Sequence, residues 1–97
     1  MEKSLLNKLS KDLEIPEKKI IDKSLNVFLD NELRNASAEI MKIKNQFNVS
    51  SLEELKNNIE KGKIEEHPAW EQIIYWENLE KRVKVVNNWM QRLHISG

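Results

Sequence analysis

Apolar residues recur three and four positions apart in four separate stretches of the chain, which is the spacing of one face of an α-helix. Turn-forming residues separate the stretches at Ile15-Pro16, Asn48-Val49-Ser50 and Gly62, and His67-Pro68 opens the last one. The pattern predicts helices over residues 3–13, 16–47, 51–61 and 68–93. We therefore expect an all-α, four-helix bundle-like fold, in which the two long helices form an antiparallel hairpin accompanied by two shorter helices.

The second stretch is unusually long. Its apolar positions alternate steps of four and three, the spacing with which a helix packs along a partner: Leu29, Leu33, Ala36, Ile40, Ile43 and Phe47. At ~1.5 Å per residue such a helix would be about 45 Å long, whereas a compact chain of this size is roughly 30 Å across. Either the helix breaks at Asn35-Ala36-Ser37, or the protein is elongated, or the helix pairs with a second copy.

Two local signals define the ends of the short helix predicted over residues 51–61. Ser51 and Glu54 have the spacing of a capping box, in which a hydroxyl and a carboxylate each bind a backbone N–H. Gly62 stands where a left-handed residue ends a helix. We expect this helix to turn the chain between the two long helices and to cover one end of them.

The last stretch carries apolar residues in two sectors. One row is Trp76, Leu79, Val83, Val86, Met90 and Leu93. A second sector, about 140° away at 100° per residue, holds Trp70, Ile74, Val85 and Trp89. Either the helix is sandwiched inside a bundle, or the second sector is the surface that binds a second copy or a protein partner. We take these four residues as the candidate partner-binding residues.

From both long stripes and the short helix we predict a largely buried core. Its members are Leu25, Phe28, Leu29, Leu33, Ile40, Leu55, Trp76, Leu79 and Val83. Ninety-seven residues are enough for one modest core, so residues 1–97 are expected to form a single helical domain.

Composition narrows the class of protein. Hydrophobic residues make up 39% and charged residues 33%, with two Gly and two Pro, which is typical of a helix-rich chain. The sequence contains no Cys, no apolar run of the ~20 residues that span a membrane, and an N-terminal apolar stretch too short for a signal peptide. We expect a cytoplasmic protein without metal that does not bind membranes.

Charge is balanced overall but uneven along the chain. The net charge is zero, yet residues 52–80 carry a local charge of −5 and residues 81–97 a local charge of +4. These charges are either solvated helix faces or an acidic patch that docks a basic partner. The candidate acidic patch consists of Glu65, Glu66, Glu71 and Glu77.

Residues with catalytic or ligand-binding chemistry are sparse. The adjacent Glu65, Glu66 and His67 do not converge as metal ligands without help from elsewhere, and His94 lies near the end of the last helix. The sequence has no Gly-rich phosphate loop, no HExxH and no catalytic Ser/His/Asp arrangement. We therefore predict no catalytic residue and no cofactor, and a protein that is not an enzyme.

Two segments resemble known proteins. LSKDLEIPEKKIIDKSLNVFLDNEL, from residue 9 to 33, resembles the helical part of ribbon-helix-helix proteins, small dimeric regulators common among bacterial and archaeal antitoxins. The resemblance covers about residues 5–35 and implies dimer-core roles for Ile15, Ile20, Ile21, Ser24, Leu25 and Leu29. HPAWEQIIYWENLEKR is similar to a segment of small helical, antitoxin-like proteins of archaea and bacteria.

Ribbon-helix-helix proteins read DNA with a strand placed just before the first helix. Here only Met1–Ser4 precede that helix, and Glu17 stands where a phosphate would be held, so we expect no tight sequence-specific DNA binding. Our hypothesis is a non-enzymatic, antitoxin-like protein-binding module, whose acidic, Trp-bearing second half masks a partner such as a basic toxin. A homodimer fits the same pattern. The alternatives are a helix-turn-helix transcriptional regulator and a structural coiled-coil adapter.

Overall fold

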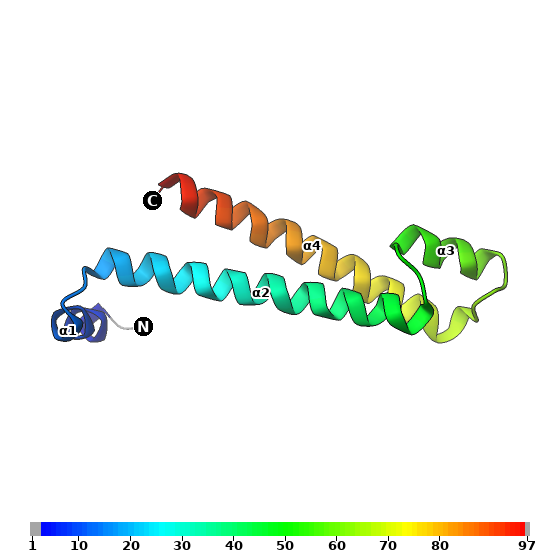
Figure 1. The fold of residues 1–97 in the computed structure, drawn as a ribbon, viewed down its shortest axis with the longest axis horizontal. Coiled ribbons are helices and arrows are strands. Elements are labelled where there is room, and N and C mark those ends of the chain that lie inside the picture. The colour runs from blue at the N-terminus through cyan, green and yellow to red at the C-terminus, as the bar shows by residue number, and fades with distance from the viewer. Residues whose placement is uncertain (1–2, 97) are drawn as a thin grey trace.

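The computed structural model describes residues 3–96, which form helices and connecting turns without a strand. The helices are α1 (Lys3–Leu13), α2 (Glu17–Phe47), α3 (Leu52–Glu60) and α4 (Glu66–Ser96) (Figure 1). Helices α2 and α4 form a long antiparallel hairpin, α3 packs against α4 at its closed end, and α1 lies across the start of α2. The predicted all-α class and the long hairpin are confirmed, and each helix end lies within three residues of its predicted position.

The molecule is elongated. Its principal extents are 62 × 23 × 17 Å and its radius of gyration is 19.6 Å, whereas a compact chain of this length would have a radius of about 12.5 Å. Helix α2 runs without interruption through Asn35-Ala36-Ser37, so the predicted alternative of a break there is wrong. The long helix is accommodated by an elongated shape.

Helices α1, α2 and α3 end in the same way. A residue with a positive φ follows each of these helices. Glu14 (57°) and Asn48 (52°) come directly after α1 and α2, and Gly62 (74°) comes two residues after the end of α3. In each case the N–H of the next residue donates to the carbonyl five positions earlier, at 2.9 to 3.1 Å. These bonds form Schellman motifs, which satisfy carbonyls that the helix leaves unpaired. The predicted left-handed end at Gly62 is confirmed.

The start of α3 is held by two serines. Ser51 Oγ accepts a hydrogen bond from the Glu54 N–H at 3.1 Å, as the capping box predicted. The Glu54 carboxylate, however, binds one residue earlier than expected, accepting from the Ser50 N–H (3.0 Å) and the Ser50 hydroxyl (2.7 Å). The Ser50 N–H first, and its hydroxyl second, lower the pKa of Glu54 below its ordinary value of 4.5.

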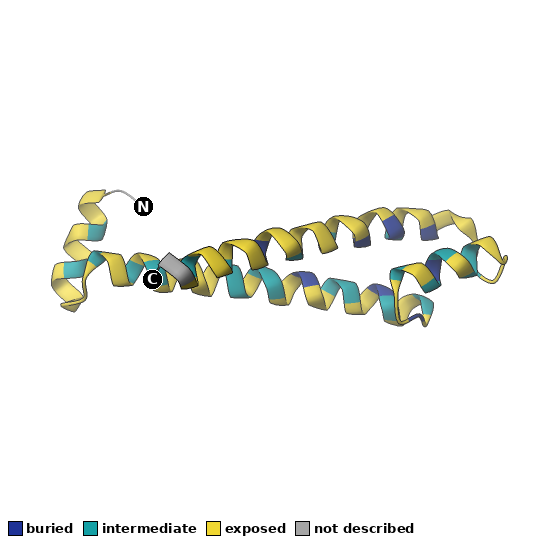
Figure 2. Ribbon diagram, turned by 90° about the horizontal axis from the view of Figure 1, so that it is seen from above, coloured by how far each residue is buried: buried dark blue, intermediate teal, exposed yellow. Residues whose placement is uncertain are grey.

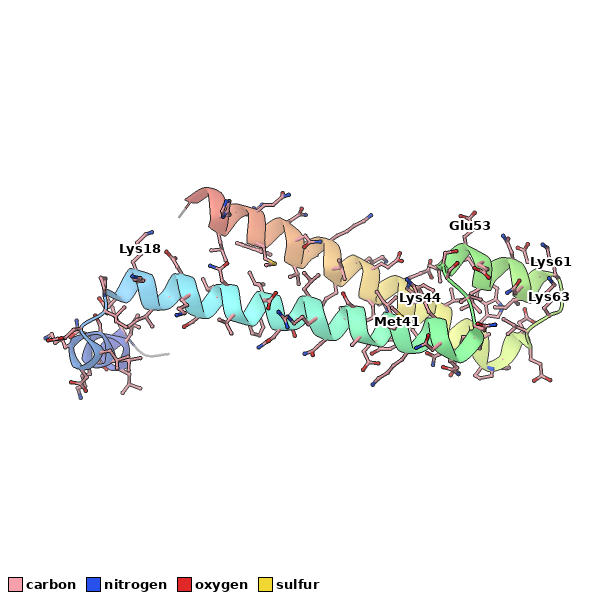
Figure 3. All side chains as sticks on the ribbon, viewed as in Figure 1. Lys18, Met41, Lys44, Glu53, Lys61 and Lys63 are labelled. Carbon is pink, nitrogen blue, oxygen red and sulfur yellow. The ribbon has the colours of Figure 1, made fainter. Side chains whose placement is uncertain are left out.

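The core lies at the closed end of the hairpin, where α2, α3 and α4 meet (Figure 2). It consists of Ile43, Val49, Leu55, Ile73 and Trp76. The indole N–H of buried Trp76 donates to Glu80 Oε1 at 3.1 Å, so burial leaves it with a partner. Charged side chains, among them Glu53, Lys61 and Lys63, project outward from this end (Figure 3).

The other half of the hairpin is more open than predicted. Leu55 and Trp76 are buried, and five further predicted core residues are half-buried: Leu29, Leu33, Ile40, Leu79 and Val83. Leu25 and Phe28 are 41% and 58% exposed, so their assignment to the core is wrong. The reason is that α4 rises away from α2 toward its C-terminus, which leaves the first half of α2 without a close neighbour (Figure 1).

Candidate functional site

An apolar groove occupies the open end of the hairpin, between the first half of α2 and the second half of α4. It encloses about 620 Å³. Its apolar lining comprises Leu25, Phe28, Leu29, Val85, Val86, Trp89 and Leu93. Polar residues Glu32, Asn78, Lys81 and Arg82 line its remaining side. Two helices that diverge around apolar side chains leave a slot that a third apolar element can fill.

Charged contacts bridge the groove and position its largest side chain. Arg82 of α4 pairs with Glu32 of α2 and so ties the two helices together at the edge of the groove. The Arg92 guanidinium lies over the Trp89 ring, 4.7 Å from the ring centroid, a distance at which a cation is attracted to the aromatic face. Trp89 is nevertheless 49% exposed.

The groove continues toward the closed end along the same side of the hairpin. A smaller hollow of about 350 Å³ shares Glu32, Asn78 and Arg82 with the groove and adds Tyr75. At 100° per residue, Trp70, Ile74, Val85 and Trp89 lie within a sector of about 100° around the α4 axis, and Tyr75 lies about 40° beyond Trp89.

We call this surface the apolar face and define it by eight exposed apolar residues of α2 and α4. On α2, Ile21 lies about 20° from Phe28 around the helix axis, on the same side as the groove. The members of the apolar face are Ile21, Leu25, Phe28, Trp70, Ile74, Tyr75, Val85 and Trp89, each 41–58% exposed.

The candidate partner-binding residues predicted from sequence share this face but differ in surroundings. Val85 and Trp89 line the groove, whereas Trp70 and Ile74 lie about four turns earlier on α4. The Trp70 indole N–H donates to Glu66 Oε1 at 3.0 Å. Sequence reasoning missed the contribution of α2, chiefly Phe28. The available signal was the excess of apolar residues around the first half of α2, more than one neighbouring helix can cover.

The predicted acidic patch is exposed but does not form one cluster. Glu65, Glu66, Glu71 and Glu77 all lie at the surface. Glu77 pairs with Lys56 of α3 at 3.5 Å. Around the α4 axis Glu71 and Glu77 are about 120° apart, on either side of Trp70 and Ile74. Glu71 and Glu77 therefore flank Trp70 and Ile74.

A family model matches the whole chain, residues 1–97. The chain belongs to the uncharacterized protein MJ0235 family. Nothing among the curated proteins and nothing among the solved structures matches it. The description of this family states no activity, substrate or partner, so the surface of the molecule is the basis for a functional proposal.

The described part of the chain contains neither a cluster of metal ligands nor a membrane-spanning helix. Across residues 3–96, no group of three or more His, Asp or Glu side chains is arranged to hold a metal ion. His67 and His94 are both exposed. Among the helices α1 to α4, none is long and apolar enough to cross a membrane.

Proposed function

We propose that this protein is a non-enzymatic protein-binding module, which holds an amphipathic helix of another polypeptide chain on its apolar face. The observation that carries the proposal is the apolar groove between α2 and α4, together with the exposed apolar residues of α4 that lie within about 100° of one another around its axis. Single exposed apolar residues are common on protein surfaces, but a contiguous set marks an interaction site. Four members of the apolar face, Leu25, Phe28, Val85 and Trp89, line the groove between the diverging helices.

The geometry suits a helix as the ligand. An amphipathic helix commonly binds by laying its apolar side chains into a groove between helices. Here Phe28, Val85 and Trp89 offer rigid apolar surface, and the core at the closed end holds α2 and α4 in place. Large aromatic side chains dominate binding energy at such interfaces because they bury much area at a small entropic cost.

A more specific form of this proposal is that the partner is a basic protein, such as the toxin that an antitoxin masks. It depends on the exposed acidic residues of the second half of the chain. Glu65 and Glu71 are exposed and form no ion pair with residues 3–96, so their charges are available to a basic partner. Opposite charges at the rim of an interface speed association, and salt screens this effect. A partner of this class would therefore associate more slowly as the salt concentration rises.

The test compares three tagged forms expressed in the native host together with the untagged chain. These are the wild-type protein, Trp89→Glu in the groove and Met41→Glu as a matched control. Met41 is 52% exposed and lines a different hollow, which shares no residue with the groove (Figure 3). Each co-purifying chain, including the untagged copy, is then purified and titrated against each of the three tagged forms to measure its dissociation constant.

We expect one purified chain to bind wild type and Met41→Glu equally. Binding to Trp89→Glu should be weaker by about thirtyfold or more, the effect of losing one aromatic anchor. A chain that binds all three forms equally would place the interaction elsewhere. The absence of any chain that binds wild type would contradict the proposal.

A further inference from the structure

The exposed row along α4 is symmetric about its centre in the spacing of its residues and in the positions of its large apolar side chains. Its positions are Trp70, Ile74, Asn78, Lys81, Val85 and Trp89, separated by steps of four, four, three, four and four. If two such helices lie antiparallel with a two-fold axis midway between Asn78 and Lys81, large apolar residues meet large apolar residues. Trp70 of each copy then lies level with Trp89 of the other, and Ile74 with Val85.

Charge along α4 favours the same arrangement. Acidic residues beside the apolar face lie in the first half of α4, at Glu66, Glu71 and Glu77. The second half, from Lys81 onward, carries four basic residues and no acidic one. An antiparallel pair brings the acidic half of each helix alongside the basic half of the other, whereas a parallel pair would bring like charges together.

The exposed area of the chain is large enough for such a pairing. The accessible surface is 7663 Å². A compact monomer of this mass exposes about 5,800 Å², so the chain exposes about 1,900 Å² more. A stable interface of standard size buries about 800 Å² per partner. The excess therefore exceeds what one dimer interface needs.

We propose that the occupant of the apolar face is a second copy of this chain, with α4 packed antiparallel on α4 about a two-fold axis. Trp70 and Ile74 of each copy enter the groove formed by Phe28, Val85 and Trp89 of the other. The contact is isologous, so each copy uses the same surface and the assembly closes at two chains. This inference rests on the proposed function, because it names the chain that the apolar face binds.

The oligomeric state of the full chain gives the first test. Sedimentation equilibrium over a range of concentrations should yield twice the monomer mass for the wild-type chain. Ile74→Glu and Val85→Glu should each raise the dimer dissociation constant by about thirtyfold or more, because each charge is opposed by an apolar residue of the other copy. The control Met41→Glu, outside the apolar face, should leave the constant unchanged. Circular dichroism should show that all three variants keep their helices.

Because the natural chain contains no Cys, introduced thiols can report the register. An equimolar mixture of Ile74→Cys and Val85→Cys chains should form the mixed disulfide on mild oxidation. Neither chain should couple with itself, since like positions would lie roughly 16 Å apart along the helices at ~1.5 Å per residue. Coupling of Ile74→Cys with itself would instead show a parallel pair and overturn the arrangement.

The failures of the two proposals can be told apart. A monomer at every concentration, combined with a different chain that binds in a Trp89-dependent way, would overturn the second copy as occupant and leave the protein-binding function standing. A monomer that binds no other chain would overturn both. A dimer indifferent to Ile74→Glu and Val85→Glu would show that the copies meet on another surface.

Discussion

Replacing Leu55 by Ala tests whether the closed end supplies the stability of the fold. Leu55 is 0% exposed and belongs to the cluster that joins α2, α3 and α4. Each buried CH2 contributes about 0.8 kcal/mol, and truncation of a buried Leu also leaves a cavity, so the total loss should be about 3 kcal/mol. For a domain of this size that corresponds to a melting temperature lower by about 12–24 °C.

The matched control is Leu13→Ala, the same substitution at a side chain that is 55% exposed at the end of α1. We expect the control to cost less than about 1 kcal/mol, because most of the side chain is in water in the folded protein. Both variants are measured at one protein concentration by urea and thermal unfolding followed by circular dichroism, since association shifts apparent stability. Equal losses at Leu55 and Leu13 would refute the assignment of stability to the closed end.

Three further predictions concern the ends of α3 and nucleic acid. Gly62→Ala should destabilise the protein by about 1 kcal/mol in urea unfolding. The cost comes from the backbone alone, because φ is +74° at this position and an added Cβ would meet no atom within 4 Å. An unchanged stability would show that the turn adopts another conformation at no cost. Because hydrogen bonds lower the pKa of Glu54, the stability that this carboxylate contributes should be complete above pH 4.5 and be lost as the pH falls further. Glu54→Gln should remove this part of the dependence of unfolding free energy on pH. An unchanged pH dependence in the variant would contradict the prediction. Fluorescence anisotropy should detect no tight binding to duplex DNA at physiological salt, because the net charge of the chain is zero. The basic residues near the start of α2 also share one hollow with acidic ones: Lys18, Lys19, Lys23, Asp22 and Asp30. A nanomolar dissociation constant for a defined operator would favour the regulator alternative.

The helices and their ends could be predicted because the interactions that set them are local. The capping bond of Ser51 spans three residues, and the turn at Gly62 spans five. The apolar spacing of α2 and α4 likewise reports which side of each helix faces a neighbour. The Glu54 carboxylate accepts from the N–H of Ser50 and not from the expected N–H of Ser51, so the spacing of the capping box predicted this partner only to within one residue.

How far apart the two long helices lie could not be predicted. Leu25 and Phe28 have the same helical spacing as Ile40 and Ile43, yet only the latter pair lies where α3 and α4 close over α2. Periodicity identifies a face but not the distance to the next helix, which depends on the side chains of both helices and on their crossing angle. Ile73 was missed as well, because it lies outside the stripe predicted for α4, yet it is buried in the cluster that also contains Ile43 of α2 and Leu55 of α3.

The sequence therefore predicted the α4 part of the candidate site but not the α2 part. The sector of Trp70, Ile74, Val85 and Trp89 stood out because one helix cannot bury two apolar sectors against a single neighbour. The contribution of Phe28 depends on the divergence of α2 and α4, which only the structure reveals. Phe28, which its spacing assigned to the core, is therefore a surface residue because α4 lies too far from α2 to cover it.

This separation of a packed end from an open end has a consequence for how binding and stability respond to mutation. The cluster around Leu55 and Trp76 lies at one end of a molecule 62 Å long, and the groove lies at the other. Substitutions far apart with no shared neighbours act nearly independently. Charges placed at Val85 or Trp89 should therefore weaken association while the core stays intact, whereas truncation of Leu55 should lower stability in every state of association. A molecule built in this way can present a large apolar surface because the residues that hold it together are not the residues that bind.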